Sequence, residues 1–438
     1  MQYVFVADSN ELNNIDTTLS IAGVTDSYLY SLFPALNKQS SGILTVSKTG
    51  WNINHSNEIF SKHSTLIDSG GYSVLTGAVP PEKIKTALQC YIHYAKCGIE
   101  DYDNLFSFDV PCSLKFDEMN TEQAIYEANL DSLERTIDLC REMPEISKKL
   151  FFVWHFKMRP QYYIWKDLHN SLDIPKFFHN YAIGGLVGIR GKAKINYSAF
   201  TGMAYGCLLE FLRGNYADRR FRLHVLGVYL PCDRLQMALL EKIFRRYIQD
   251  EDRPALFSYD SVNPKRSALL NAKAPFLDMS DEGLFTVYRT LTEVPLECHR
   301  KVYTEGGFQK IFLELERKIN GQRLENPKSF VPLYVYSFGV MDRLLESLIE
   351  EDELDKLIFE CSSFTTVKRK VENILSKYAE KYPYIFTKYR CESILKNTER
   401  LHWWHKWFQG YYPGYDYDKM MEREIADINF DKIMTLRS

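Results

Sequence analysis

The sequence predicts an α/β protein, a TIM-type (β/α)8 barrel with an appended helical C-terminal region. Between about residue 41 and residue 275, short β-branched or aromatic runs alternate with longer stretches whose apolar residues recur at helical spacing. This alternation is typical of βα units around a parallel sheet. Several of the short runs also end on a polar residue or a glycine, and a TIM barrel gathers its active-site residues at the C-terminal ends of its strands.

The candidate strands come first. In chain order they are GILTVS (42–47), TLIDS, LFSFDV, LFFVWH, YAIGGLV, RLHVLGV and ALFSYDS. Helical spacing is clearest between Thr121 and Cys140 and between Leu235 and Tyr247. The N-terminal MQYVFV is a further short apolar strand, without the basic region of a secretory signal.

The residues at the strand ends favour a barrel over an open sheet. They are Asp68, Asp109, His155, Gly184, Gly185, Gly227 and Asp260. An open doubly wound sheet would gather strand ends around one crevice, but no GxGxxG fingerprint follows the first strand. We therefore expect a barrel over residues 1–330 and a helical region over residues 331–438.

The helical region contains a basic and aromatic segment. Residues 381–409 hold six Lys or Arg against two Glu, interleaved with tyrosine, phenylalanine and tryptophan. This mixture would suit a groove for an unpaired nucleic-acid strand. Helices that pack their aromatic faces against the barrel would give the same composition, so both interpretations stay open.

Composition limits the function classes. Hydrophobic content of 45% and charged content of 25% are ordinary for a soluble protein, and no apolar run is long enough to span a bilayer. A net charge of −3 argues against a general nucleic-acid coat, so any such site is local. Nine cysteines without a CxxC pair indicate reduced thiols. We expect a cytoplasmic protein with no membrane role.

Four short motifs carry a family resemblance. They are DSGGYS (68–73), YAIGGLVG (181–188), HVLGV (224–228) and YDSVNPKR (259–266). In the same order they resemble DSGG[FY]Q, AxGGLxxG, YLMGV and FDCVxPTR of the tRNA-guanine transglycosylase superfamily. The resemblance covers Gly42 to Asn271 and implies a glycosyltransferase (pentosyltransferase) that replaces guanine in a nucleic acid.

The resemblance assigns Asp260 as nucleophile and Asp68 as general base. Exchange of a base requires cleavage of the bond to C1′, and an oxocarbenium-like transition state needs a carboxylate close to that carbon. Attack by Asp260 would give a covalent glycosyl-enzyme intermediate. The incoming base must then lose its N9 proton, for which Asp68 would serve. An isolated Asp before Gly-Gly is otherwise a simple turn or cap.

The same resemblance implies a pocket for a flipped-out base. Tyr72 would stack on the base, and Asp109 would accept hydrogen bonds from its N1 and N2 donors. Gly184 and Gly185 would offer backbone groups at close approach. The family usually has Asp-Glu-Cys where this chain has Asp109-Val-Pro-Cys112, so the match is looser there.

The remaining pocket candidates are His155, Leu226 and Gly227. Leu226 and Gly227 would form the wall opposite the stacking aromatic. His155 stands where the family strand commonly ends in a glutamine-glycine pair, and it either contacts the base or is a structural histidine.

Basic residues near the motifs would hold phosphates that flank the target nucleotide. They are Lys265, Arg266, Arg190, Lys192 and Lys194. For the last three, surface solvation is the competing explanation.

The sequence departs from the family at its zinc site. The family holds a structural zinc through CxCxxC and a following His, whereas this chain offers only Cys298 and His299 after the nucleophile, with Cys361 and Cys391 far away. We expect no metal and no cofactor.

This departure favours DNA as the polymer. Kept barrel motifs and an added helical region look most like the DNA deazaguanine transglycosylases of bacterial modification systems and phages. The expected partners are DNA and a free base such as 7-cyano-7-deazaguanine, in a bacterial or phage-infected cell. The alternatives are a zinc-free tRNA-guanine transglycosylase, a noncatalytic binding subunit and a base-removing glycosylase.

Overall fold

The computed structural model describes most of the chain. The described residues are 1–7, 16, 17, 20, 23–25, 27–31, 64–71, 74, 79, 81–111, 121–156, 159–185, 198–214, 220–248, 255–269 and 274–426.

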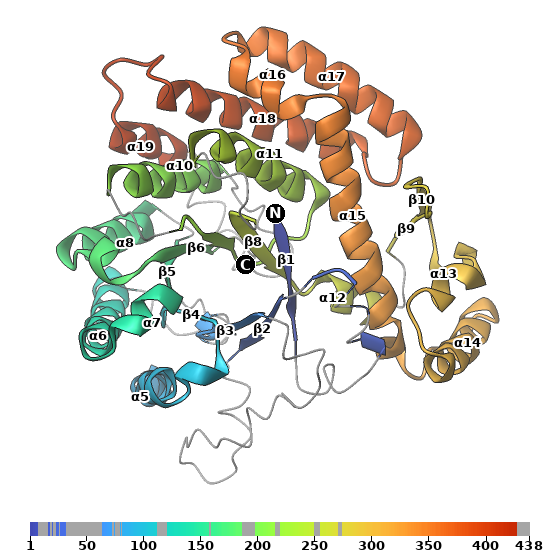
Figure 1. Ribbon diagram of the computed structural model, residues 1–438, viewed down its shortest axis with the longest axis horizontal. Helices are drawn as coiled ribbons and strands as arrows, with labels where there is room; N and C mark the ends of the chain where they lie inside the picture. Colours follow the sequence, from blue (N-terminus) through green and yellow to red (C-terminus); the bar gives the residue numbers. More distant parts are fainter. Residues whose placement is uncertain are drawn as a thin grey trace. The chain divides into compact units, whose positions relative to one another are not determined.

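Eight strands close into a barrel in the order β1 to β8 (Figure 1). They are β1 (Gln2–Val6), β2 (Ser27–Ser31), β3 (Ser64–Asp68), β4 (Asn104–Phe106), β5 (Leu150–His155), β6 (Asn180–Gly184), β7 (Leu223–Val225) and β8 (Phe257–Ser261). The strand pairs within it are parallel. The predicted TIM-type barrel with a helical C-terminal region is confirmed.

The barrel begins at the N-terminus of the sequence. β1 pairs with β8, with Val4 opposite Asp260 in the register. The N-terminal apolar run is therefore a barrel strand, although the βα rhythm of the sequence starts only near residue 41. The candidate strand at 42–47 lies outside the described residues.

One predicted strand is shorter than its apolar run. β4 ends at Phe106, although LFSFDV continues to Val110. The side chain of Asn129 bonds both backbone groups of Val110, at 2.8 and 3.0 Å, and Ser132 donates to the carbonyl of Phe108 at 2.6 Å. Helix α6 (Glu122–Glu142) thus takes up the backbone groups that a strand ladder would otherwise use.

The chain divides into two compact units, residues 1–26 with 228–414 and residues 27–227 with 415–438. In the second unit, β2 to β7 are accompanied by helices. They are α5 (Pro81–Cys97), η3 (Ile99–Asp101), α6, α7 (Pro144–Lys149), α8 (Arg159–Ser171), α9 (Ile174–Phe177), α10 (Ser198–Arg213) and α19 (Tyr417–Ala426). Helix α19 packs on α10, where a Cβ at Gly206 would lie 2.3 Å from the Tyr417 hydroxyl. A glycine is therefore required at that contact.

The first unit holds β1, β8 and the hairpin of β9 (Phe276–Met279) and β10 (Phe285–Tyr288). Its helices are α11 (Pro231–Ile248), α12 (Asn263–Leu269), η6 (Leu291–Glu293), α13 (Leu296–Arg300), α14 (Glu305–Ile319), η7 (Pro327–Phe330), α15 (Val331–Glu351), α16 (Leu354–Glu360), α17 (Phe364–Lys381) and α18 (Lys388–Phe408). Helices α15, α16 and α18 pack on α11 (Figure 1). This cover explains why residues 231–241 of α11 are all buried.

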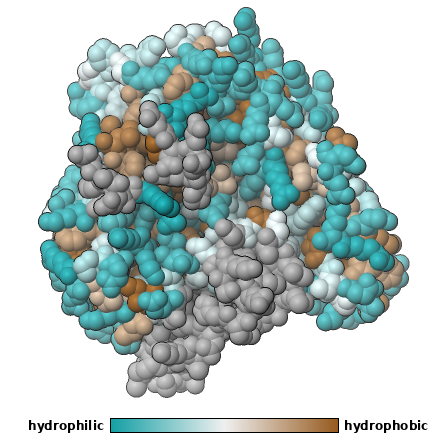
Figure 2. Space-filling view, viewed as in Figure 1, coloured by the Kyte–Doolittle hydropathy of each residue, from teal (hydrophilic) through white to brown (hydrophobic). Residues whose placement is uncertain are grey.

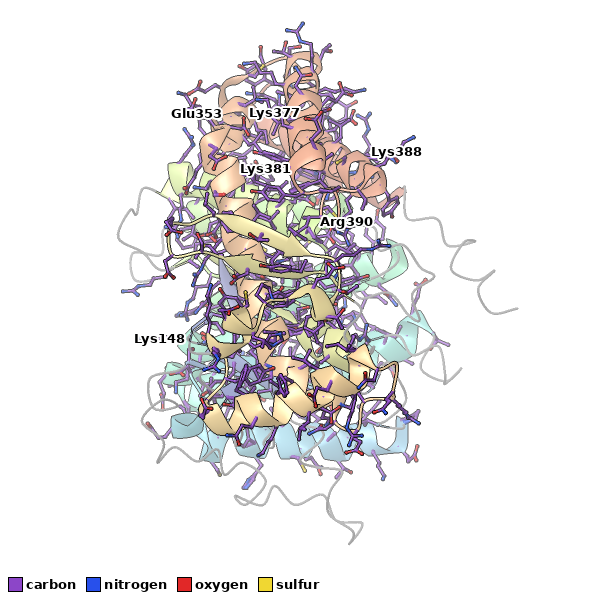
Figure 3. All side chains as sticks on the ribbon, turned by 90° about the vertical axis from the view of Figure 1, so that its right-hand side faces the viewer. Lys148, Glu353, Lys377, Lys381, Lys388 and Arg390 are labelled. Carbon is purple, nitrogen blue, oxygen red and sulfur yellow. The ribbon has the colours of Figure 1, made fainter. Side chains whose placement is uncertain are left out.

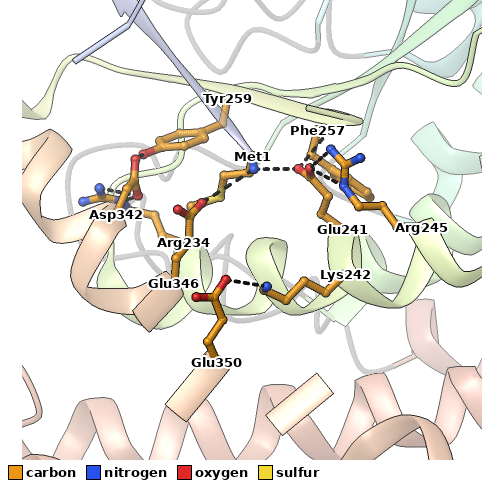
Figure 4. A network of polar contacts seen from close by, with 10 residues as sticks. All are labelled: Met1, Arg234, Glu241, Lys242, Arg245, Phe257, Tyr259, Asp342, Glu346 and Glu350. Carbon is orange, nitrogen blue, oxygen red and sulfur yellow. Dashed lines mark hydrogen bonds and ion pairs between the residues drawn. The ribbon is translucent and has the colours of Figure 1, made fainter. Parts of the chain in front are cut away.

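A polar network joins α11 and α15 to β8 (Figure 4). Arg234 Nε donates to Asp342 Oδ1 at 2.8 Å, and the Tyr259 hydroxyl donates to the same carboxylate. The Arg234 guanidinium also lies 3.8 Å from the centre of the Phe338 ring. Nearby, the amino group of Met1 lies 2.8 Å from Glu241 Oε2. Buried charges are thus paired on the outer side of β8.

Hydrophilic residues cover most of the described surface in the view of Figure 2. Within the described ranges, no helix is long and apolar enough to cross a membrane.

Candidate active site

Packing around β5 shows which of its side chains face the barrel interior. The Phe152 ring lies 5.6 Å from that of Trp165 in α8 and 5.7 Å from that of Phe178, so it faces the helices. Successive side chains of a strand point to opposite faces. Val153 and His155 therefore point to the inner face, with His155 at the C-terminal end of the strand.

Three side chains from separate strand ends form a hydrogen-bonded chain in this unit. Asp109 Oδ2 lies 2.5 Å from His155 Nδ1, and Ser69 Oγ donates to Asp109 Oδ1 at 2.7 Å. Ser69 is fully buried, and only 4% of Asp109 and 9% of His155 are exposed. Both oxygens of the carboxylate therefore already have a partner inside the protein.

The segment that carries Asp109 is fixed from both sides. The Tyr91 hydroxyl donates to the carbonyl of Phe106 at 2.9 Å, and burial raises the pKa of Tyr91 well above its usual value, so it stays a donor. Ser107 N donates to the carbonyl of Phe151, and its hydroxyl accepts from Val153 N at 3.1 Å. Together with the contacts of α6, these bonds hold Asp109 toward β5.

Glycines make room around the Asp109–His155 pair. A Cβ at Gly71 would lie 2.6 Å from Asp109 Oδ2, closer than real contacts allow. Gly184 is the register partner of His155, and a Cβ there would lie 3.3 Å from His155 Nδ1 and 3.4 Å from Leu226 Cδ1. Gly185 has a φ of 75°, and a Cβ would lie 2.5 Å from the Phe156 carbonyl oxygen. A side chain is sterically excluded at Gly71 and Gly185, and at Gly184 it would fit only tightly.

One polar atom of the pair has no hydrogen-bond partner within the described part of the chain. His155 Nε2 is buried and unbonded. A carboxylate only accepts, so Asp109 fixes the Nδ1–H form of the ring. Nε2 is then an acceptor in neutral imidazole and a donor in imidazolium, and a buried group of this kind is normally paired with a water molecule or a ligand atom.

Asp68 and the turn after β7 complete the predicted residues of this unit. Asp68 is the last residue of β3, half-buried, and has polar interactions of its own. Leu226 donates its N–H to the Ile183 carbonyl at 2.9 Å, and Gly227 follows with a φ of 78°. Both turn residues are half-buried.

In the other unit, Asp260 occupies the inner face of β8. Its neighbour Tyr259 faces α11 and α15, and Phe257 lies 5.4 Å from Phe244 of α11. By alternation, Asp260 points to the barrel interior, where 8% of it is exposed. Its carbonyl accepts from Val228 N at 3.0 Å.

Basic and aromatic side chains accompany Asp260 in the same unit. Lys265 of α12 lies 5.4 Å from the centre of the Phe5 ring, and Arg266 is exposed. Burial, Asp233 and Tyr389 raise the pKa of the Tyr229 hydroxyl, and Arg266 lowers it; the net shift is upward. Tyr229 and Tyr389 are 38% and 54% exposed. Both Arg266 and Tyr389 therefore lie within electrostatic range of Tyr229, and we call these three exposed residues the Tyr229 patch.

The basic and aromatic segment at 381–409 is partly buried. Tyr382, Phe386 and Trp404 are buried, as the helix-packing interpretation requires. Exposed positions remain at Tyr384 and Tyr389. Figure 3 shows Lys377, Lys381, Lys388 and Arg390 on α17 and α18, and the first three are exposed.

Several predicted site residues lie outside the described residues. They are Tyr72, Arg190, Lys192 and Lys194. Ser69, in contrast, is a site residue that the sequence analysis missed. Its only signal in the sequence is its place directly after Asp68 in the DSGGYS motif.

The described residues contain no cluster of three or more potential metal ligands. Cys298 Sγ instead donates to Asp278 Oδ2 at 3.1 Å, and Lys301 Nζ lies 3.2 Å from the same oxygen. The hydrogen bonds of Cys298 and Tyr336 and the charge of Lys301 lower the pKa of Asp278 despite its partial burial. This cluster ties the β9–β10 hairpin to α13 and α15.

A search of protein families and of characterised proteins finds no match to this chain.

Proposed function

We propose that the chain replaces guanine in DNA with a 7-deazaguanine derivative through a covalent aspartyl intermediate. The observation that carries the proposal is the position of its carboxylates. Asp68 ends β3, and Asp260 lies near the end of β8 on the inner face. The C-terminal ends of strands are where a parallel barrel holds its catalytic residues.

Asp260 would form the covalent bond. One carboxylate oxygen attacks C1′ as the bond from C1′ to N9 breaks, and the electron pair of that bond leaves with the base. The incoming base, deprotonated at N9 with Asp68 as the acceptor, then attacks C1′ and releases Asp260. The scheme requires both carboxylates to reach the same nucleotide.

The buried Asp109–His155 pair supports recognition of a base. A base flipped out of its strand offers hydrogen-bonding groups along its edges, and His155 Nε2, which has no partner among the described residues, could meet one of them. Glycine at 184 leaves space beside the ring. The resemblance assigns Asp109 the contact with N1 and N2 of the base. Each Asp109 oxygen already accepts one hydrogen bond, from Ser69 or His155, so the base would use the second lone pair of an oxygen.

DNA is preferred over tRNA because of the resemblance to the DNA branch. The Tyr229 patch supports an unpaired strand near Asp260, since exposed tyrosines stack on bases and Arg266 can meet a phosphate. None of these side chains distinguishes deoxyribose from ribose.

The test offers isotopically labelled guanine and, separately, labelled 7-cyano-7-deazaguanine with DNA and with tRNA. We expect stable incorporation of the deazaguanine into DNA. Label only in tRNA would instead identify a zinc-free tRNA enzyme. Abasic sites without incorporation would identify a glycosylase, and no reaction with either polymer would favour a noncatalytic binding subunit.

A further inference from the structure

The hydrogen-bonded chain of Ser69, Asp109 and His155 has a feature that base binding alone does not require. Binding needs a donor or an acceptor, and an amide would supply it. Here the group is an imidazole whose Nδ1 lies 2.5 Å from a buried carboxylate. A carboxylate behind an imidazole fixes its tautomer and stabilises the imidazolium form. The arrangement is suited to proton transfer at Nε2.

His155 Nε2 is the end of the Ser69–Asp109–His155 hydrogen-bonded series, and it can still bind or transfer a proton. It is buried, has no partner among the described residues and belongs to a side chain on the inner face of the barrel. Ser69 holds the far oxygen of Asp109 at 2.7 Å, so the carboxylate cannot rotate without losing a hydrogen bond. Gly71 permits this packing, because any larger residue would collide with the carboxylate.

We propose that His155 is the general acid that protonates N7 of the departing guanine, with Asp109 and Ser69 as positioning residues. This inference rests on the proposed base exchange and deepens it. As Asp260 bonds to C1′, the bond from C1′ to N9 breaks and its electron pair enters the base. The imidazolium proton passes from Nε2 to N7, so that guanine leaves as a neutral tautomer and His155 becomes neutral imidazole.

We call this proton transfer from His155, positioned by Asp109 and Ser69, the relay. The relay makes base exchange run from guanine to 7-deazaguanine. A 7-deazaguanine has carbon at position 7 and therefore no lone pair to receive the proton. His155 assists the departure of guanine but cannot assist the departure of the deazaguanine that replaces it. The product therefore accumulates although the covalent step can in principle run in both directions.

The test compares two substrates that differ at this atom. Single-stranded oligodeoxynucleotides carry labelled guanine or labelled 7-deazaguanine at one position, and base release is measured with wild type and His155→Gln. Glutamine keeps a hydrogen-bond donor but transfers no proton. General acid catalysis contributes roughly 100- to 10,000-fold, so we expect guanine release to fall by at least about 100-fold. The departure of 7-deazaguanine never uses this acid, so its release falls only through the lost base contact, which both substrates share. The ratio of guanine release to 7-deazaguanine release should therefore fall by roughly 100-fold or more.

Asp109→Asn is the second variant, and it shares the selective loss because it removes the charge behind His155. In both variants the readout is the ratio of guanine release to 7-deazaguanine release, and urea denaturation of each variant shows that its fold is intact. Equal losses on the two substrates, or no loss on guanine, would overturn the relay while base exchange stands. Wild type that releases neither base from DNA or RNA would overturn the exchange itself, and the relay with it.

Discussion

At the residue scale, the proposed chemistry depends on which way single side chains point along a strand. On β8, Tyr259 meets the carboxylate of Asp342 on the outer side, and this fixes Asp260 on the inner side. On β5, the packing of Phe152 against α8 does the same for His155. Because side chains alternate between the two faces of a strand, the packing of one residue against a helix places its neighbour, here Asp260 or His155, on the inner face.

Removal of the proposed nucleophile is the first prediction. Asp260→Asn keeps the size of the side chain but cannot form a stable ester with C1′. We expect base exchange to fall by about three orders of magnitude or more, measured as incorporation of labelled base. Asp278→Asn is the matched control, a buried carboxylate held by Cys298 and Tyr336, and it should leave exchange within about 10-fold of wild type provided that it folds. Wild-type exchange by Asp260→Asn would refute the assignment.

Sequence predicts the single residues better than their partners. Asp68, Asp109, His155 and Asp260 are visible because each follows an apolar run. The Ser69–Asp109–His155 chain is not visible, since it joins three motifs through side-chain geometry that no local pattern encodes.

At the element scale, α11 and α15 support β8 through the buried network of Figure 4. Arg234 is 1% exposed and its partner Asp342 is 14% exposed as a side chain. Loss of one partner leaves a charge buried without compensation. The network therefore gives β8 a fixed position against two helices.

Breakage of that ion pair gives the second prediction. Asp342→Asn should lower the free energy of unfolding by about 3 to 5 kcal/mol, measured by urea denaturation. Glu350→Gln is the matched control, because its 2.9 Å contact with Lys242 is exposed and should be worth no more than about 1 kcal/mol. Similar small losses from both variants would show that the buried pair contributes little.

The Tyr229 patch gives the third prediction. Tyr389→Ala removes an exposed ring and should weaken binding of single-stranded DNA by about 1 to 3 kcal/mol, measured by fluorescence anisotropy at fixed salt. Tyr411→Ala removes a ring that is 56% exposed in the same unit, outside the patch. Equal effects of the two variants on DNA binding would show that the Tyr229 patch does not bind single-stranded DNA specifically.

Element boundaries show where sequence prediction stops. The apolar run LFSFDV predicts a strand to Val110, but side chains of α6 capture its last carbonyl and amide groups. The aromatic residues of α18 look alike in composition, yet Trp404 is buried and Tyr389 is exposed. Tertiary contacts between distant segments decide both outcomes.

At the scale of the whole molecule, the βα rhythm predicts a parallel α/β fold, and the residues at the strand ends favour a barrel. The pairing of β1 with β8 joins the first and last strands of the barrel, which are far apart in the sequence, and no local pattern predicts it. Helices α15, α16 and α18 pack on α11, so most of the appended region shares an apolar core with a barrel helix.

Buried histidines give the fourth prediction. Burial lowers the pKa of His299 and of His405 from 6.5 to about 4. Between these values the unfolded chain binds the protons that the folded protein excludes, so the free energy of unfolding falls as the pH drops from 6.5 to 4. Above pH 6.5 the two groups contribute no pH dependence. The loss is on the order of 2 to 3 kcal/mol per histidine.

Urea denaturation at several pH values between 7.5 and 4 measures this slope. His405→Gln should reduce the slope by about half, since glutamine takes up no proton in either state and His299 still contributes. A slope unchanged by the substitution would show that other groups, such as the carboxylates, govern stability in this window.

Covalent catalysis by Asp260 is tested by peptide mass spectrometry of the protein after reaction with a DNA oligonucleotide and denaturation. The account predicts a nucleic-acid adduct on the peptide that contains Asp260, absent from Asp260→Asn and removed when free 7-cyano-7-deazaguanine is supplied. An adduct on another residue, or efficient exchange with no covalent species at any time, would contradict it.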